Sequence, residues 1–319
     1  MITRPYGNTG VELSAIGLGG HEFLPDGSSR GFNEDRGDAI RPGYTGKGYG
    51  GPNRIGLLKL AFESGINFLD VTIDPEQEAL GRNLRDVPPP YDVYIQTRPQ
   101  GMGYSYDPGN RKMTDFGLLK AEVERILTLL QREQLEILNV PFMQEALDED
   151  PEYLDKIGEN VDRLKGEGLI RFASADTNSG EATYLAQIGS GAFDSVSMNL
   201  NLADCAAREK VLPAAAAAGM GVITREVFMK GRLFRYGEWA GITDRDLLCR
   251  ASLTWNLSVP EVTTVLVGAQ DKGQLTNALS ALETDSEDPA ISAALDSVEA
   301  EEACTDAREQ RAKGFQHAT

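Results

Sequence analysis

Short apolar segments and helical patterns alternate from one end of the chain to the other, and this alternation constrains the fold more than any other feature. A brief apolar run is typical of a strand that is buried on both faces, as in a parallel sheet covered by helices. With no linker between the segments, we predict one α/β domain over residues 1–319, a closed (β/α)8 barrel. The eight predicted strands are residues 15–19, 66–71, 93–97, 135–140, 170–173, 195–198, 221–224 and 264–267.

Local signals predict where individual helices begin and end. Asp150 followed by Pro151 is typical of an N-cap and a first helical position, so we expect a helix to start there. An alanine-rich stretch over residues 206–218 predicts a second helix, which Gly219 should end.

Several segments lie outside the predicted barrel strands. The glycine-containing stretch 7–10 predicts an N-terminal hairpin. Long loops over residues 21–54 and 98–113 follow the first and third strands, at the end of a barrel where active sites are assembled. We interpret these loops as functional, with a plain insertion as the alternative. The helix at 289–300 and the charged tail 301–319 are expected to be peripheral.

The composition limits the partners and the location of the protein. Its net charge of −18 opposes binding to nucleic acids and to anionic lipids. The sequence contains neither an apolar run long enough to span a bilayer nor an N-terminal signal peptide. Cys205, Cys249 and Cys304 are far apart, which favours free thiols in a reducing compartment. We therefore expect a cytoplasmic protein with a small-molecule ligand and leave the oligomeric state open.

Six motifs occur in an order that points to a known family. Residues 65–70 read GINFLD, residues 80–84 read LGRNL, and residues 168–172 read GLIRF. The others are the opening segment 6–20, the segment 222–233 that ends in GRL, and VGA at 267–269. Together they resemble the aldo-keto reductases over residues 2–285. The resemblance implies their barrel and the reduction of carbonyl compounds with NADPH.

The resemblance also implies a catalytic set of Asp, Tyr, Lys and His, and most of this set is replaced. In the family, Tyr protonates the carbonyl oxygen and Lys lowers the pKa of Tyr. Asp70 keeps the Asp position, but Arg98 stands at the Lys position and Pro141 at the His position. The segment 71–78 is two residues shorter than in the family and contains no tyrosine. We therefore do not expect the family's usual mechanism.

The positions that the resemblance assigns to the cofactor are altered as well. The pair that holds the nicotinamide carboxamide falls at Asp176-Thr177, and the residue that stacks on the ring falls at Leu200. Asp271 stands where a 2′-phosphate would bind, which is repulsive. We expect NAD(P)H binding only in a weakened form. The candidate residues for it are Asp176, Asn178, Asn199, Arg225, Gly231, Gly268 and Lys272.

Polar residues at the strand ends are the remaining candidates for catalysis. His21 follows the first strand and is interpreted as a general acid or base, or as a hydrogen-bond partner of the long loop. Asp70 and Arg98 end the second and third strands, and form either a structural ion pair or part of the site. Asp74 and Glu76 are carboxylate partners of His21, or surface charges in a rigid turn around the intervening proline. No spacing predicts a metal site.

Two kinds of function stay open at this point. The first is a divergent enzyme that acts on a small polar or carbonyl-containing metabolite, as a reductase or as an isomerase, epimerase or lyase. Arg98 and Arg225 would anchor an anionic group in such an enzyme. The second is a non-catalytic protein that binds a ligand or partner, which predicts a plugged pocket and an exposed apolar patch. The loop tyrosines either replace the missing acid or pack; they are Tyr44, Tyr49, Tyr104 and Tyr106.

Overall fold

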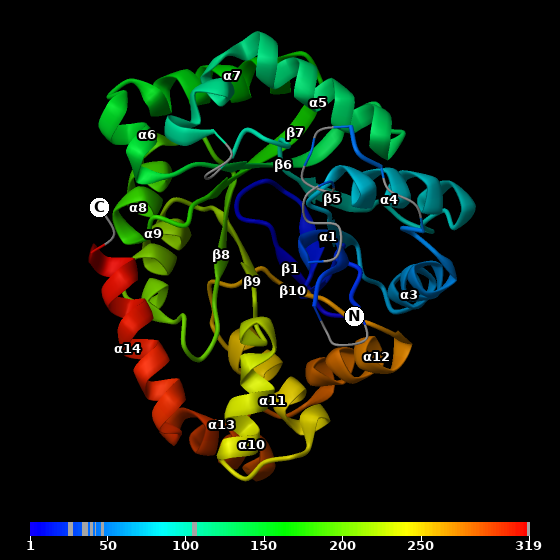
Figure 1. The fold of residues 1–319 in the computed structure, drawn as a ribbon, viewed down its shortest axis with the longest axis vertical. Coiled ribbons are helices and arrows are strands. Elements are labelled where there is room, and N and C mark those ends of the chain that lie inside the picture. The colour runs from blue at the N-terminus through cyan, green and yellow to red at the C-terminus, as the bar shows by residue number, and fades with distance from the viewer. Residues whose placement is uncertain are drawn as a thin grey trace.

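The computed structural model describes residues 1–24, 28–33, 38, 41, 43–45, 48–103 and 107–317. Within these residues, eight parallel strands close into a barrel, and helices surround them (Figure 1). The last strand closes the barrel by pairing with the first, so the predicted fold class is confirmed. The barrel strands are β3 (Ile16–Gly19), β4 (Phe68–Asp70), β5 (Tyr94–Thr97), β6 (Leu135–Pro141), β7 (Ile170–Asp176), β8 (Ser195–Asn199), β9 (Gly221–Arg225) and β10 (Thr264–Val267).

Helices occupy the connections between the strands. In the part of the chain that the structure describes, no helix has the length and apolar character needed to cross a membrane. The helices are α1 (Arg30–Asn33), α3 (Pro52–Glu63), α4 (Asp74–Asp86), α5 (Phe116–Leu130), α6 (Gln144–Glu149), α7 (Tyr153–Gly166), α8 (Glu181–Ser190), α9 (Val211–Ala217), α10 (Arg232–Trp239), α11 (Arg245–Leu257), α12 (Lys272–Ser280), α13 (Pro289–Ala300) and α14 (Glu302–His317).

The predicted N-terminal hairpin is present and lies against the barrel end where the strands begin. Its strands are β1 (Thr3–Pro5) and β2 (Glu12–Ser14), which pair antiparallel. The hydroxyl of Tyr6 lies 2.6 Å from that of Ser195, the first residue of β8. Gly7 has a φ of +54°, and a Cβ there would come within 2.4 Å of a backbone oxygen. Only glycine fits this close approach.

Two helices differ from the sequence-based expectation. Helix α7 begins at Tyr153, because the Asp150 side chain accepts a hydrogen bond from the backbone of Glu152 in a turn that precedes the helix. The helix predicted over residues 206–218 is divided into a short 3-10 helix and α9. Pro213 lacks an N–H and fits only in the first turn of a helix, which sets the start of α9.

The segment predicted as a peripheral charged tail is an ordered helix on the outside of the barrel. Helix α14 buries Cys304 completely and places Phe315 against Tyr184, with ring centroids 6.1 Å apart. Arg308 also donates a hydrogen bond to the carbonyl oxygen of Leu202. Half-buried residues recur at helical spacing after the buried Cys304, so this helix is part of the packed domain.

The barrel interior is divided into an apolar layer and a polar layer. Successive side chains of a strand point to opposite faces, so every second residue points inward. The apolar layer lies near the hairpin and contains Tyr6, Phe68, Ile137, Phe172, Ile223 and Leu266. Two residues further along the same strands, toward their C-terminal ends, come the polar or small residues Asp70, Asn139, Ser174, Arg225 and Gly268.

Candidate active site

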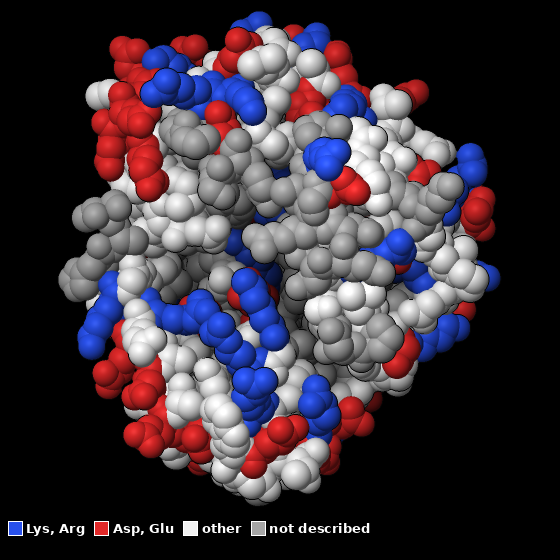
Figure 2. All heavy atoms as spheres, viewed as in Figure 1, with Lys and Arg blue, Asp and Glu red and all other residues white. Residues whose placement is uncertain are grey.

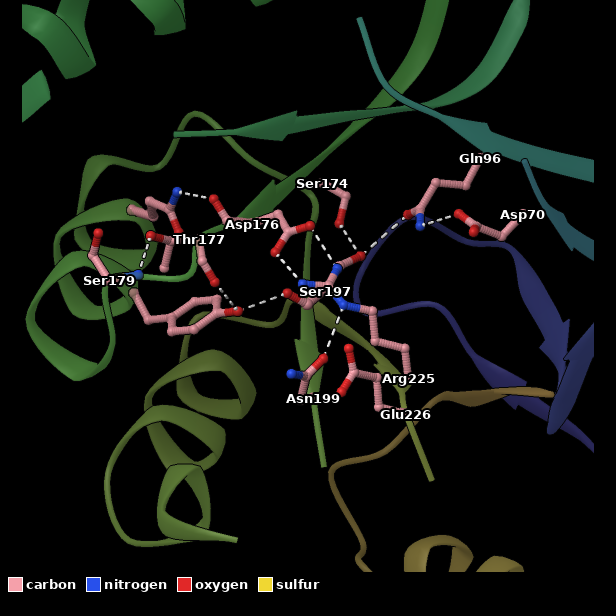
Figure 3. Close-up of polar contacts among 12 residues, drawn as sticks. Asp70, Gln96, Ser174, Asp176, Thr177, Ser179, Ser197, Asn199, Arg225 and Glu226 are labelled. Atoms are coloured by element: carbon pink, nitrogen blue, oxygen red, sulfur yellow. Dashed lines mark hydrogen bonds and ion pairs between the residues drawn. The ribbon is translucent and has the colours of Figure 1, made fainter. Parts of the chain in front are cut away.

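A chain of hydrogen bonds crosses the barrel interior at the level of Asp70 (Figure 3). The side-chain amide of Gln96 on β5 donates to Asp70 Oδ1 over 2.9 Å. Its carbonyl oxygen accepts from the Ser197 hydroxyl over 3.2 Å, and the Ser174 hydroxyl lies 3.0 Å from that of Ser197. Four strands thus hold the Asp70 carboxylate in one orientation.

Arg225 joins three neighbouring strands at the same end of the barrel (Figure 3). Its Nη1 and Nη2 donate to the two carboxylate oxygens of Asp176 over 2.5 and 2.7 Å. Its Nε donates to Asn199 Oδ1 over 3.1 Å. The Asp176 side chain is 1% exposed and that of Arg225 is 25% exposed. A bidentate pair of this kind fixes geometry as well as charge.

His21 and Glu76 form the second polar contact of the site. His21 Nδ1 lies 2.7 Å from Glu76 Oε1, and the other Glu76 oxygen accepts from the backbone N–H of Thr72. Glu76 belongs to the first turn of α4, where a carboxylate is stabilised by the helix dipole. The Glu76 side chain is buried, whereas the His21 side chain is 35% exposed. The buried carboxylate therefore orients a ring that remains accessible.

His21 and Glu76 each stabilise the charged form of the other. Burial lowers the pKa of His21, but the charge and hydrogen bond of Glu76, with the charge of Asp70, outweigh it and raise the pKa above its ordinary value. Burial likewise raises the pKa of Glu76, whereas His21, the Thr72 N–H and Arg54 hold the pKa of this carboxylate below its ordinary value. The arrangement favours an imidazolium next to a carboxylate near neutral pH.

Asp70 has a pKa suited to proton transfer. Burial raises the pKa of Asp70 to about 6, although the Gln96 hydrogen bond and the charges of His21, Arg98 and Arg225 act in the opposite direction. A base is most effective when its pKa lies near the working pH. Asp70 and His21 thus give the site one group that accepts and one that donates a proton at neutral pH.

Of the two alternatives for Asp70 and Arg98, the structure does not support the structural ion pair. Asp70 accepts a hydrogen bond from Gln96, and the charge of Arg98 lowers the pKa of this carboxylate. The physical reason is the register of β5: Gln96 lies directly opposite Asp70, whereas Arg98 lies two residues beyond the level of that carboxylate. Arg98 remains one of the cations of the site.

The prediction of Asp74 as a catalytic carboxylate is also wrong. Asp74 starts α4 and is completely buried. Arg125 of α5 binds both of its oxygens, one of them over 2.9 Å, and the backbone N–H of Gly43 donates to it as well. The supposed turn at residues 74–76 is instead the first turn of a helix, because a proline at the second position favours helix initiation. Asp74 therefore joins α4 to α5.

For the four loop tyrosines the sequence leaves open whether they are replacement acids or packing residues, and two of them lie in the described part of the chain. Tyr49 is buried, and the guanidinium of Arg30 lies 4.2 Å from the centre of its ring, so Tyr49 packs. Tyr44 is half-buried, and Tyr104 and Tyr106 lie outside the described residues. In the described ranges, no group of three or more His, Cys, Asp or Glu side chains is arranged to hold a metal ion.

Sequence reasoning missed Gln96, Arg54 and Asn83. Gln96 lies two residues before Arg98, so the alternation of side chains along β5 could have placed it inside the barrel. Arg54 and Asn83 lie on α3 and α4 beside Glu76, and no local sequence pattern predicted that they belong to the site. They come from helices that follow β3 and β4 along the chain, so the sequence around His21 could not place them.

Comparison with known proteins supports the fold. No protein-family model and no curated protein matches the sequence. The holo form of the aldo-keto reductase AKR11C1 from Bacillus halodurans matches with a TM-score of 0.68 and 18% identity, over 93% of this chain and 96% of that one. Two structures from Pseudomonas aeruginosa, described as an aldo-keto reductase, match with TM-scores of 0.59 and 0.60 and 21% identity, over 88% of this chain and 95% of theirs. The chain has the aldo-keto reductase fold.

The nicotinamide positions of the aldo-keto reductase fold are poorly suited to that cofactor here. Both oxygens of Asp176 accept hydrogen bonds from Arg225, so this carboxylate is already occupied at the position expected to hold the carboxamide. Asp271 caps α12 by accepting from the Gln274 N–H. The Phe23 ring lies 2.6 Å from where a Cβ on Gly268 would stand. Each of these positions is already occupied by a contact within the chain, so we assign no chemistry to a nicotinamide there.

The remaining predicted cofactor residues are not brought together. Asn178 is exposed beyond the end of β7. Gly231 has a φ of +85° and precedes α10. Lys272 is exposed at the start of α12, where its side chain lies against Gly56 of α3. Of the predicted set, only Asp176, Asn199 and Arg225 form one cluster.

Proposed function

We propose that this protein is a divergent aldo-keto reductase superfamily member that catalyses proton transfer on a small anionic, carbonyl-bearing metabolite. The observation that carries the proposal is the 2.7 Å contact between His21 and the buried Glu76 carboxylate, in a site that also holds Asp70. A histidine oriented by a buried carboxylate is suited to general acid and base catalysis. Isomerisation and epimerisation both fit this chemistry.

In the proposed reaction, Asp70 takes a proton from the carbon next to the substrate carbonyl. The electron pair of the broken C–H bond forms a C=C bond, and the carbonyl oxygen takes the proton that His21 donates from Nε2. When the carbon that loses the proton carries a hydroxyl group, the neutral product is an enediol, which then collapses: His21 regains a proton from an oxygen, and Asp70 returns its proton to a carbon. If the proton returns to the carbon that lost it, the configuration of that carbon is inverted or its hydrogen is exchanged. If the proton returns to the neighbouring carbon, the substrate is isomerised.

An anionic substrate is supported by the charge around the end of β9. The segment 225–235 contains four basic residues and one acid, in a chain whose net charge is −18. Lys230, Arg232 and Arg235 are exposed. The face shown in Figure 2 is hollowed near its centre, and Lys and Arg atoms lie in and beside this hollow. Such a field attracts small anions.

The non-catalytic alternative has less support. It predicted an exposed apolar patch, but the large exposed hydrophobic residues of the described ranges are spread over separate elements: Met1 and Ile2, Tyr91, Leu118 and Trp239. All three cysteines are free thiols, which agrees with the cytoplasmic location that we propose. The proposed partner remains a small molecule.

Solvent deuterium exchange tests the proposed function directly, because it follows the proton transfer itself rather than any one product. The protein is incubated in D2O with small hydroxy-carbonyl carboxylates, phosphate esters and neutral analogues, and proton NMR follows the C–H signal next to the carbonyl. We expect exchange with at least one anionic compound and none with its neutral analogue. The absence of exchange across the panel would contradict the proposal.

The fold itself favours a second candidate, carbonyl reduction with a nicotinamide, since a matching structure is a holo aldo-keto reductase. The same panel is therefore repeated with NADPH and NADH, with absorbance at the reduced nicotinamide band as the readout. We expect no oxidation of either cofactor and no change of protein fluorescence on titration. Cofactor oxidation without deuterium exchange would replace proton transfer by reduction.

A further inference from the structure

A small polar cavity lies next to the His21–Glu76 pair, on the side toward α3 and α4. Its volume is about 10 Å³, and its polar walls are Glu22, Arg54, Glu76 and Asn83. Leu58 and other apolar side chains complete the lining. The cavity therefore brings charged groups together with apolar walls, where hydrogen bonds that buried polar atoms fail to make are strongly unfavourable.

Three buried polar atoms of the cavity walls have no hydrogen-bond partner among the described residues. They are Nη1 of Arg54 and both side-chain polar atoms of Asn83. Asn83 is 1% exposed and Arg54 is 8% exposed. Arg54 is held from its other side, where Nη2 donates to the carbonyl oxygen of Gly19 over 2.8 Å. These two donor atoms and one acceptor atom therefore require a hydrogen-bond partner that can both accept and donate.

We propose that Arg54 and Asn83 bind one water molecule in this cavity, and that the water holds Arg54 against the Glu76 carboxylate. A cavity of this volume accommodates a single water, and buried waters make two to four hydrogen bonds. The water accepts from Arg54 Nη1 and Asn83 Nδ2, and its own protons are directed to the acceptors of the walls. A metal cation is disfavoured because the guanidinium of Arg54 already supplies positive charge there.

The bound water acts on Glu76 through Arg54, one of the groups that stabilise this carboxylate. The other groups that act on Glu76 are His21 from the end of β3, the Thr72 N–H before α4 and Arg54 from α3. Burial raises the pKa of the neighbouring Glu22, and the Gly50 N–H and Arg54 offset this only in part. Arg54 thus acts on the buried Glu76 carboxylate and on the half-buried Glu22 carboxylate, and its orientation matters to both. Arg54 and Asn83 are positioning residues for Glu76, a role that rests on the proposed function of His21.

Asn83→Leu and Asn83→Ser distinguish a bound water from an unhydrated cavity. Leucine removes the water and leaves Arg54 Nη1 buried without a partner, so we expect a lower melting temperature than that of the wild type. Serine is smaller but can still bind water, so its melting temperature should lie above that of the leucine variant. If the cavity is dry in the wild type, leucine removes two unsatisfied groups, and its melting temperature rises. That outcome would overturn the water site.

A kinetic readout separates positioning from mere stability. In the deuterium-exchange assay we expect Asn83→Leu to lower kcat about tenfold with KM within twofold, and Asn83→Ser to retain most of kcat. An unchanged kcat for folded Asn83→Leu contradicts the positioning role. A high-resolution crystal structure of the full chain must also show a water within hydrogen-bonding distance of Arg54 Nη1 and Asn83. That structure tests the site even if the wild type catalyses no exchange.

Discussion

Replacing His21 by glutamine is expected to lower the rate of substrate deuterium exchange by about 10²–10⁴-fold, the usual contribution of a general acid or base. Glutamine is polar but cannot gain and lose a proton near neutral pH. Glu76→Gln should cause a similar loss although it is nearly isosteric. Its amide N–H can donate to Nδ1 of His21, which selects the wrong tautomer and removes the charge that favours the imidazolium.

The chain offers a matched control for this prediction. His317, in the last turn of α14, is the only other histidine in the sequence. His317→Gln should leave the exchange rate within twofold of the wild type. Melting curves of all variants establish that they are folded. A His21→Gln rate within threefold of the wild type would remove His21 from the mechanism.

Replacing Arg225 by methionine is expected to lower the free energy of unfolding by about 3–5 kcal/mol, the effect of breaking a buried ion pair from one side. The variant removes the N–H groups that bind both oxygens of Asp176, whose side chain is 1% exposed. Methionine keeps much of the side-chain volume, so the change is mainly electrostatic. Urea unfolding followed by circular dichroism measures the difference.

The double variant Arg225→Met with Asp176→Asn is the control for that interpretation. It neutralises Asp176 as well as removing the Arg225 cation, so no unpaired charge is left buried. The double variant should therefore recover at least half of the free energy of unfolding that Arg225→Met loses. Arg225→Lys should fall between the wild type and the methionine variant, because an ammonium keeps the charge but loses the bidentate geometry. A double variant as unstable as Arg225→Met would show that the carboxylate is not the cause.

The barrel could be predicted because its signals are local. Each strand is an uninterrupted apolar segment between helical patterns, and all eight predicted strands are present. The corrections to the fold concern where helices begin, where one is divided and the tail that forms a helix. The residues from Asp74 to Glu76 were interpreted as a turn around Pro75, although a proline in second position with nearby acids is equally typical of a helix N-terminus.

The site was predictable in its residue types but not in its pairings. Alternation along the strands places Asp70, Asp176 and Arg225 inside the barrel, and all three lie there. Which residue binds which depends on register between strands and on helices far away in sequence. Asp70 therefore bonds to Gln96, and Asp74 binds Arg125 of α5. The pairing of His21 with Glu76 matches a predicted partnership, while the catalytic role of both stays a prediction.

A pH titration of the two histidines by NMR tests the central claim, that Glu76 holds His21 protonated beside Asp70. With ¹⁵N-labelled histidine, His317 serves as the internal reference in the same sample. We predict that His21 titrates above pH 6.5, because its pKa is raised, and that its neutral form carries the proton on Nδ1. In Glu76→Gln the pKa of His21 should fall, because the charge and the hydrogen bond that raise it are lost. A wild-type His21 that is already neutral at pH 6, or that carries its proton on Nε2, would contradict the account.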